Sequence, residues 1–180
     1  MGMFDSVWAN CPSCGQEHEF QSKSGDCFLE NYTLENAPDD VMINVNRHSP
    51  VECDCGTIFE IDIENRKPVI SNKMIYIGSP YSHPHKDIRI KRFELVSKFA
   101  AELVSKGHIA ISPITYGHVL LDYKDMPTDF EFWNNFCIRL LKKSDYLYVL
   151  KIDGWNESIG LKEEIKFAKE NNIKIKYIEI

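Results

Sequence analysis

From Met74 onward, short apolar runs alternate with longer segments in which apolar positions recur at helical spacing. Short runs rich in β-branched and aromatic residues predict four strands, at residues 74–78 (MIYIG), 108–114 (HIAISPI), 146–152 (YLYVLKI) and 173–180 (IKIKYIEI). Three segments with helical periodicity separate them, at residues 87–107, about 128–143 and 158–170. In the first, one apolar stripe is predicted to be buried: Phe93, Val96, Ala100, Leu103 and Val104. Alternating strands and helices predict an α/β fold with a parallel sheet and helices on both faces.

The first third of the chain differs from the rest because it holds five of the six cysteines. We expect a small β module of the zinc-ribbon kind over residues 1–66, a linker over 67–73 and an α/β domain over 74–180. The turns CPSCG and CDCG each offer a pair of thiolates, so Cys11, Cys14, Cys53 and Cys55 are predicted to hold a structural zinc ion. Cys27 and His48 are the alternative ligands. Reduced, buried cysteines without metal are the competing interpretation.

Composition narrows the range of partners. A net charge of -6 argues against electrostatic binding of nucleic acid over a broad surface. Contacts with nucleic acid are therefore expected only through the cysteine module. The apolar runs are far shorter than the roughly 18 residues of a membrane span. The first ten residues lack the pattern of a secretion signal, so the expected location is the cytoplasm.

Polar residues gather directly after the predicted strands, where parallel sheets bind ligands. The three segments are SPYSHPH (79–85), SPITYGH (112–118) and DGWNES (153–158). They make His83 and Trp155 candidate substrate contacts. The competing interpretation is turn chemistry, which also favours Ser, Pro and Gly.

Helical geometry separates the two adjacent glutamates of the last helix. Relative to the stripe of Leu161, Ile165 and Ala168, Glu164 flanks the buried face and Glu163 points to solvent. Gly160, one turn earlier, would leave room for a ligand, and Ser158 could cap the helix or bind an anion. Glu164 is therefore a candidate nucleophile or base. A glutamate early in a helix can also serve only to oppose the macrodipole.

The segments MIYIGSPYSH, GHIAISPITYGH, FWNNF and LYVLKIDGWNESIGLKEEIKFA together resemble the DUF1937 family, from about Met74 to the C-terminus. The resemblance implies the flavodoxin-like fold of the nucleoside 2-deoxyribosyltransferases and related deoxynucleotide N-hydrolases. In those enzymes a glutamate in a pattern like S-x-G-x-x-x-E attacks the anomeric carbon of the sugar. Here that pattern falls on Ser158, Gly160 and Glu164.

The same resemblance implies further roles. A tyrosine and a serine after the first strand correspond to Tyr76, Ser79 and Tyr81, which would contact the carboxylate, the sugar or its 5' group. Ser158 would contact a 5'-phosphate, with Lys86 and Arg89 as supplementary charges. Superfamily members commonly form dimers that complete one another's pockets, so a homodimer is an expected assembly.

One position departs from the superfamily pattern, because Cys137 stands where an aspartate usually handles the proton of the nucleobase. A thiol is a weak donor, so Asp129 or Glu131 could take over, base activation could differ, or the site could bind without turnover. The favoured interpretation is N-glycosidic cleavage or transfer on a (deoxy)nucleoside or its 5'-monophosphate through Glu164, with no catalytic cofactor. The alternatives are a non-catalytic nucleotide-binding sensor and a nucleic-acid- or protein-binding adaptor acting through the zinc ribbon.

Overall fold

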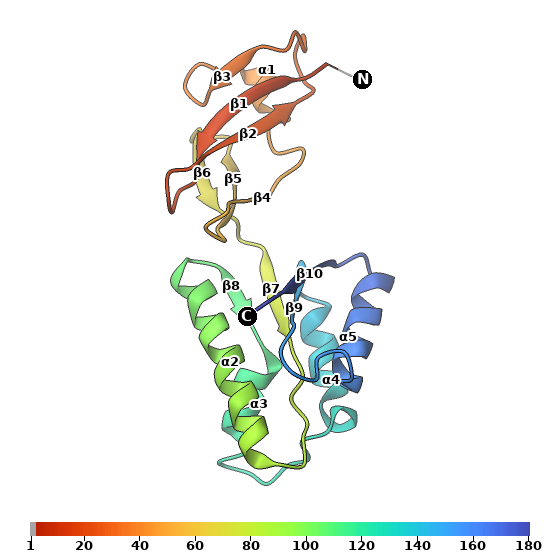
Figure 1. Cartoon of the computed structure of the whole chain (residues 1–180). Coiled ribbons are helices and arrows are strands. Elements are labelled where there is room, and N and C mark those ends of the chain that lie inside the picture. Colours follow the sequence, from red (N-terminus) through yellow and green to blue (C-terminus); the bar gives the residue numbers. More distant parts are fainter. Residues whose placement is uncertain (1–2) are drawn as a thin grey trace. The chain divides into compact units, whose positions relative to one another are not determined.

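The computed structural model describes residues 3–180, and the chain divides into two compact units between Ser71 and Asn72 (Figure 1). Within residues 3–180 no helix is both long and apolar enough to cross a membrane.

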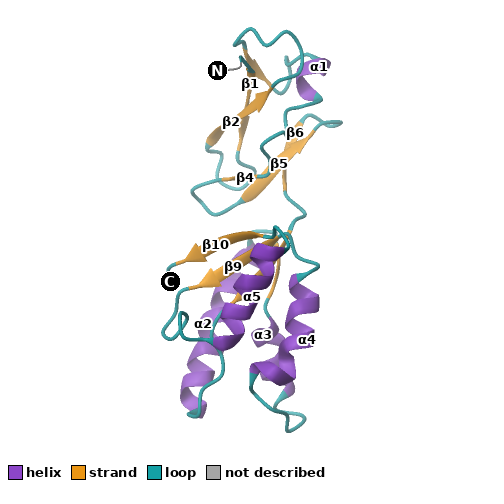
Figure 2. Cartoon of the chain, turned by 90° about the vertical axis from the view of Figure 1, so that its right-hand side faces the viewer, coloured by secondary structure: helices purple, strands orange, loops and turns teal. Residues whose placement is uncertain are grey.

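The first unit is built from two small sheets and one short helix (Figure 2). One sheet has the strand order β2-β1-β3 and the other the order β4-β5-β6. Their bounds are β1 Asp5–Asn10, β2 Glu17–Ser22, β3 Asn31–Thr33, β4 Val51–Glu52, β5 Ile58–Asp62 and β6 Lys67–Ile70, with helix α1 at Asp39–Met42. Phe20 and Phe59 meet edge to face in a core that also contains Val7, Met42 and Ile61. A module expected to depend on metal therefore also has an apolar core.

Residues 67–70 form β6 and do not belong to a linker. Val69 pairs with Glu60 and Ile70 with Phe59 in an antiparallel ladder. Pro68 occupies this strand, which lies at the edge of its sheet, where a missing backbone donor is tolerated. The expected linker over 67–73 is corrected to a boundary at Ser71 and Asn72.

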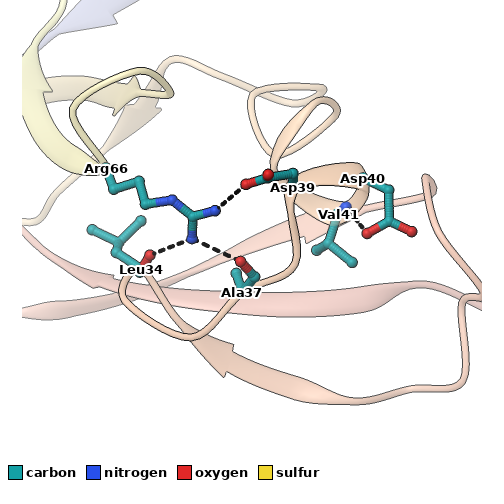
Figure 3. Close-up of polar contacts among 6 residues, drawn as sticks. All are labelled: Leu34, Ala37, Asp39, Asp40, Val41 and Arg66. Carbon is teal, nitrogen blue, oxygen red and sulfur yellow. Dashed lines mark hydrogen bonds and ion pairs between the residues drawn. The ribbon is translucent and has the colours of Figure 1, made fainter.

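Arg66, in the turn before β6, ties together the loop that leads into α1 (Figure 3). Its Nη1 donates to the carbonyl oxygens of Leu34 at 3.0 Å and Ala37 at 2.7 Å, and its Nη2 pairs with Asp39. These bonds satisfy carbonyl groups that no strand or helix uses.

The second unit contains a four-stranded parallel sheet with the order β10-β9-β7-β8. The strands are β7 Met74–Gly78, β8 Ile109–Ile111, β9 Tyr146–Leu150 and β10 Lys174–Ile178. Helices α2 Lys86–Ser105, α3 Pro113–Leu120, α4 Phe130–Leu141 and α5 Ile159–Glu170 complete it. The mixed α/β class with a parallel sheet is confirmed. After β7 the chain goes first to β8 on one side and then to β9 on the other, so β7 and β9 flank a topological switch point.

Helix α2 lies on one face of this sheet, and α4 and α5 lie on the other (Figure 1). The core against α4 and α5 includes Tyr76, Leu141, Leu147 and Leu161. Val104, expected in the buried stripe of α2, is 55% exposed. It lies at the last turn of the helix, beyond the main buried positions Val96 and Leu103.

Helix α3 begins at Pro113, within residues 108–114, which were predicted to form a strand; β8 itself ends at Ile111. The start of α3 carries two helix signals, because Ser112 caps the backbone N–H of Ile114 at 3.2 Å and Pro113 occupies the first turn. The helix then presents Gly117 and His118 to the region beyond β7.

Candidate functional site

A cavity of about 720 Å³ lies in the second unit, at the carboxyl end of β7. Its walls come from the end of β7 and the following loop, from α3, from α4 with the residues before it, and from the start of α5. This is where an open parallel sheet binds its ligands, next to the switch point. A volume of this size suits a small molecule such as a nucleoside.

Glu164 reaches this cavity from α5. Ser158 caps the helix by accepting from the N–H of Leu161 at 3.3 Å, and the helical period then turns Leu161 and Glu164 toward the sheet. Glu164 is 6% exposed, whereas Glu163 is exposed. The hydroxyl of Tyr76, itself fully buried on β7, donates to Oε1 of Glu164. A carboxyl group is thus held by a strand residue at the wall of the cavity.

Opposing effects set the protonation of Glu164. Burial raises its pKa to about 7, while hydrogen bonds from Tyr76 and Cys137 act in the opposite direction. Burial also raises the pKa of the Cys137 thiol to about 12 and that of Tyr76 well above its ordinary value, and the charge of Glu164 adds to both. Tyr76 and Cys137 therefore stay protonated and can donate to a carboxylate that ionises near neutral pH.

Gly78, at the end of β7, leaves the space that Glu164 uses. A Cβ atom at Gly78 would lie 2.9 Å from Oε2 of Glu164 and 2.9 Å from Cδ1 of Leu161. Real Cβ atoms essentially never come this close to a non-bonded heavy atom. Sequence reasoning did not select Gly78, because nothing local in MIYIG distinguishes this glycine from a strand end.

The space beside Gly160 is filled by protein, which corrects the expectation that it leaves room for a ligand. A Cβ atom there would lie 2.7 Å from Cδ2 of Phe130. Gly160 lines the cavity, but its missing side chain lets α5 approach the first residue of α4. Such contacts between helices are a common use of glycine.

A tyrosine and a histidine pair at another wall. The hydroxyl of Tyr81 and Nδ1 of His118 are 2.7 Å apart, and the His118 ring stacks on Phe93 with centroids 4.1 Å apart. Burial lowers the pKa of His118, which keeps its ring neutral at neutral pH. Tyr81 was predicted from the sequence as a site residue, but its partner His118 was not, although the segment SPITYGH that contains His118 was selected.

Arg92 of α2 joins the loops that follow β7 and β9. Its guanidinium donates to the carbonyl oxygens of Ser82 at 3.0 Å and Asp153 at 3.0 Å. Gly154 has a φ of +82°, and a Cβ atom there would lie 2.5 Å from Nη2 of Arg92. These two loops form a rim of the cavity, since Ser82 of one and Glu157 of the other line it. Arg92 therefore supports this rim, a role the sequence did not indicate.

Five of the other predicted site residues line the cavity: Ser79, Tyr81, Asp129, Ser158 and Gly160.

Trp155 and His83 are described residues that do not belong to the lining. Trp155 packs on Tyr177 and lies below Nζ of Lys151, and His83 lies beside His85. Their expected contacts with substrate stay predictions. Asp129 already caps α4 through the N–H of Phe132 at 3.0 Å.

The four predicted ligand cysteines meet in the first unit. Their sulfur atoms all lie within 4.8 Å of one another, with Cys11 and Cys55 3.7 Å apart and Cys14 and Cys53 3.5 Å apart. Four thiolates around one ion at about 2.3 Å would have sulfur atoms about 3.8 Å apart, so this set could hold a metal ion.

Both turns end at a glycine with a positive φ. Gly15 and Gly56 follow the second cysteine of each pair with φ of +79° and +85°. The thiol of Cys27 instead contacts the carbonyl oxygens of Ser24 and Gly25.

The second unit is thus an α/β domain with a buried glutamate in a ligand-sized cavity at the end of its sheet. The chain belongs to the family described as a domain of unknown function, DUF1937, whose model matches residues 73–179. No match was found among curated proteins.

Proposed function

We propose that the second unit cleaves the N-glycosidic bond of a (deoxy)nucleoside or its 5'-monophosphate, with Glu164 as the nucleophile. The carboxylate attacks C1', the base departs, and water or a second base resolves the glycosyl ester. The observation that supports this most is the burial of Glu164 at the cavity wall, with the Tyr76 hydroxyl on one of its oxygens. The nucleoside 2-deoxyribosyltransferase-like fold is part of the same proposal and accords with the strand order.

The surroundings of Glu164 suit this chemistry. Cleavage passes through an oxocarbenium-like transition state, which a nearby carboxylate stabilises electrostatically before it forms the bond. Tyr76 fixes the orientation of the carboxyl group, since its ring is fully buried on β7. A group with a pKa of about 7 is also a better nucleophile than one at 4.5 and is still substantially ionised at neutral pH.

Release of free base is the direct test. The full-length protein is incubated with a panel of ribonucleosides, deoxynucleosides and their monophosphates, and the free base is measured by chromatography. Glu164→Gln should abolish release, while Glu170→Gln, an exposed glutamate at the far end of α5, should retain it. Mass spectrometry of a quenched reaction should find a glycosyl adduct on Glu164. Equal release by Glu164→Gln would refute the assignment.

A non-catalytic nucleotide sensor is the second candidate, and the buried thiol of Cys137 beside Glu164 is the feature that favours it. A thiol with a pKa of about 12 gives a departing base little help with its proton. Calorimetry separates the candidates, because a sensor would bind a nucleoside or nucleotide with no base released over hours.

For the first unit we propose a zinc ribbon in which Cys11, Cys14, Cys53 and Cys55 hold a structural zinc ion. A set of four thiolates is typical of closed structural zinc sites. The spacing of the sulfur atoms supports this assignment. The ion would stabilise the fold of this unit and take no part in the reaction of the second.

A further inference from the structure

The lining of the cavity is acidic. Five carboxyl groups contribute to it, from the start of α4, the turn before α5 and α5 itself: Asp129, Glu131, Glu157, Glu163 and Glu164. Within the part of the chain that the structure describes, no lysine or arginine lines this cavity. A phosphate group would therefore enter against several negative charges, whereas a cation would be attracted.

Arg89 acts electrostatically on Tyr81 and His118, and Lys86 acts on His118, but the five carboxyl groups of the lining outnumber these two cations. Arg89 donates to the carbonyl oxygens of His83 and Pro84, and Arg92 donates to those of Ser82 and Asp153. Both guanidinium groups hold loops together. Ser158 uses an oxygen lone pair to cap α5, and Glu157 precedes it directly, so the start of this helix also carries a negative charge.

The cavity is also poorly equipped to protonate a departing base. A neutral nucleobase leaves as an anion unless an acid supplies a proton. Cys137, the thiol beside Glu164, is 5% exposed and has a pKa of about 12, far above the value of an efficient acid at neutral pH. Asp129 is exposed and spends one oxygen on the cap of α4.

We infer that the cavity selects a nucleoside without a 5'-phosphate whose base is already cationic, as in an N-glycosyl pyridinium or an N7-alkylated purine nucleoside. The inference rests on the proposed function and names its substrate class. An oxygen of Glu164 forms a bond to C1', the C1'–N bond breaks, and its electron pair neutralises the positive charge of the ring. The neutral base then leaves without needing a proton. Water displaces Glu164 from C1' in the second step, and one proton is released to solvent.

Matched substrates test the role of charge. The full-length protein is assayed with N-ribosylnicotinamide, its 5'-phosphate, N7-methylguanosine and guanosine, each also as the 2'-deoxyriboside. Each rate is divided by the uncatalysed rate of the same compound, because cationic nucleosides are intrinsically labile. After this division, we expect kcat/KM to be at least about tenfold higher for N7-methylguanosine than for guanosine. The same difference is expected between N-ribosylnicotinamide and its phosphate.

Variants then separate the causes. Glu131→Gln with Glu163→Gln should lower kcat/KM for N-ribosylnicotinamide and narrow its advantage over the phosphate, with Glu170→Gln as the neutral control. Cys137→Asp should raise the rate on guanosine, whereas Cys137→Asn, which offers no acidic proton, should not. Thermal unfolding of each variant checks that it is folded.

The outcomes distinguish this inference from the proposed function. Suppose that guanosine is cleaved as fast as N7-methylguanosine, or the 5'-phosphate as fast as N-ribosylnicotinamide, and that Glu164→Gln abolishes this release. The substrate class is then wrong and the glycosidase assignment stands. The inference on substrate class would also be overturned if the variant with Glu131→Gln and Glu163→Gln kept the wild-type preference for N-ribosylnicotinamide over its phosphate. If no compound releases base, both proposals fail.

Discussion

The carboxyl group of Glu164 occupies the space that a side chain at Gly78 would need. The Cβ of an alanine at Gly78 would lie 2.9 Å from Oε2 of Glu164 and 2.9 Å from Cδ1 of Leu161. Strand β7 and helix α5 are thus fitted to each other at the proposed nucleophile. Tyr76, two residues earlier on the same strand, donates to the other oxygen of the carboxyl group.

Gly78→Ala should therefore damage the site. We expect a loss of about 1–3 kcal/mol in the free energy of unfolding, as for other overpacked cores, and a loss of base release because the carboxyl group is displaced. In a Glu164→Ala background the same change should cost less, since the nearer oxygen is gone. A double-mutant cycle measured by urea denaturation checks this, and equal costs in both backgrounds would exclude the contact as the cause.

Tyr76→Phe removes the hydroxyl that favours the charged form of Glu164. A hydrogen bond to a charged group contributes about 1.5–3 kcal/mol, so the pKa of Glu164 should rise by about one unit or more. Base release by the wild-type protein should increase with pH through about 7, where the carboxyl ionises. In the variant the midpoint should move to higher pH. A profile of kcat/KM from pH 5 to 9 measures both, and an unmoved midpoint would contradict the role of Tyr76.

Much of the second unit could be predicted from the sequence because its signals are local. The strand MIYIG follows from its short run of β-branched and aromatic residues, and the choice of Glu164 over Glu163 follows from the helical period of 3.6 residues. Helix α3 was missed because Ser, Pro and Gly in SPITYGH resemble a turn, although Ser112 before Pro113 is also a helix start.

What could not be predicted depends on contacts between distant segments. Gly160 lies against Phe130, Arg92 reaches Asp153, and Tyr81 meets His118 only after the sheet has formed. The boundary of the first unit was misplaced because KPVI contains a proline and a lysine, which read as a linker. The pairing of Ile70 with Phe59 makes it a strand.

Glu164→Gln should change the pH dependence of stability. The folded-state pKa of about 7 is above the ordinary value of 4.5, so the folded protein retains a proton that the unfolded chain releases between these values. Stability from this group is complete below pH 4.5 and is lost as pH rises through 7, a cost of about 3 kcal/mol. The variant has no such loss, so its stability relative to wild type should increase from pH 4 to pH 8. Urea unfolding in a Trp8→Phe background, where only Trp133 and Trp155 of the second unit report, measures the difference.

Arg92→Met should loosen the rim of the cavity while leaving the core intact. The change removes donors to the carbonyl oxygens of Ser82 and Asp153 but keeps an apolar side chain of similar length. We expect KM for a cleaved nucleoside to rise and hydrogen exchange at residues 153–157 to speed up. Lys91→Met, an exposed neighbour on α2, is the matched control. Unchanged exchange in Arg92→Met would show that the two loops are held by other contacts.

Removal of metal should act on the first unit alone. Structural zinc contributes about 10–16 kcal/mol in zinc-finger peptides, comparable to the whole stability of a small domain, so a strong chelator should expose residues 3–71 to protease. The tryptophan signal of the second unit in the Trp8→Phe background should persist.

Metal analysis of the purified chain should find about one zinc per molecule. Cys14→Ser, at an exposed ligand position, should lower that content, whereas Cys27→Ser, outside the cluster, should retain it. Full zinc content in Cys14→Ser, or loss of metal in Cys27→Ser, would contradict the assigned ligands.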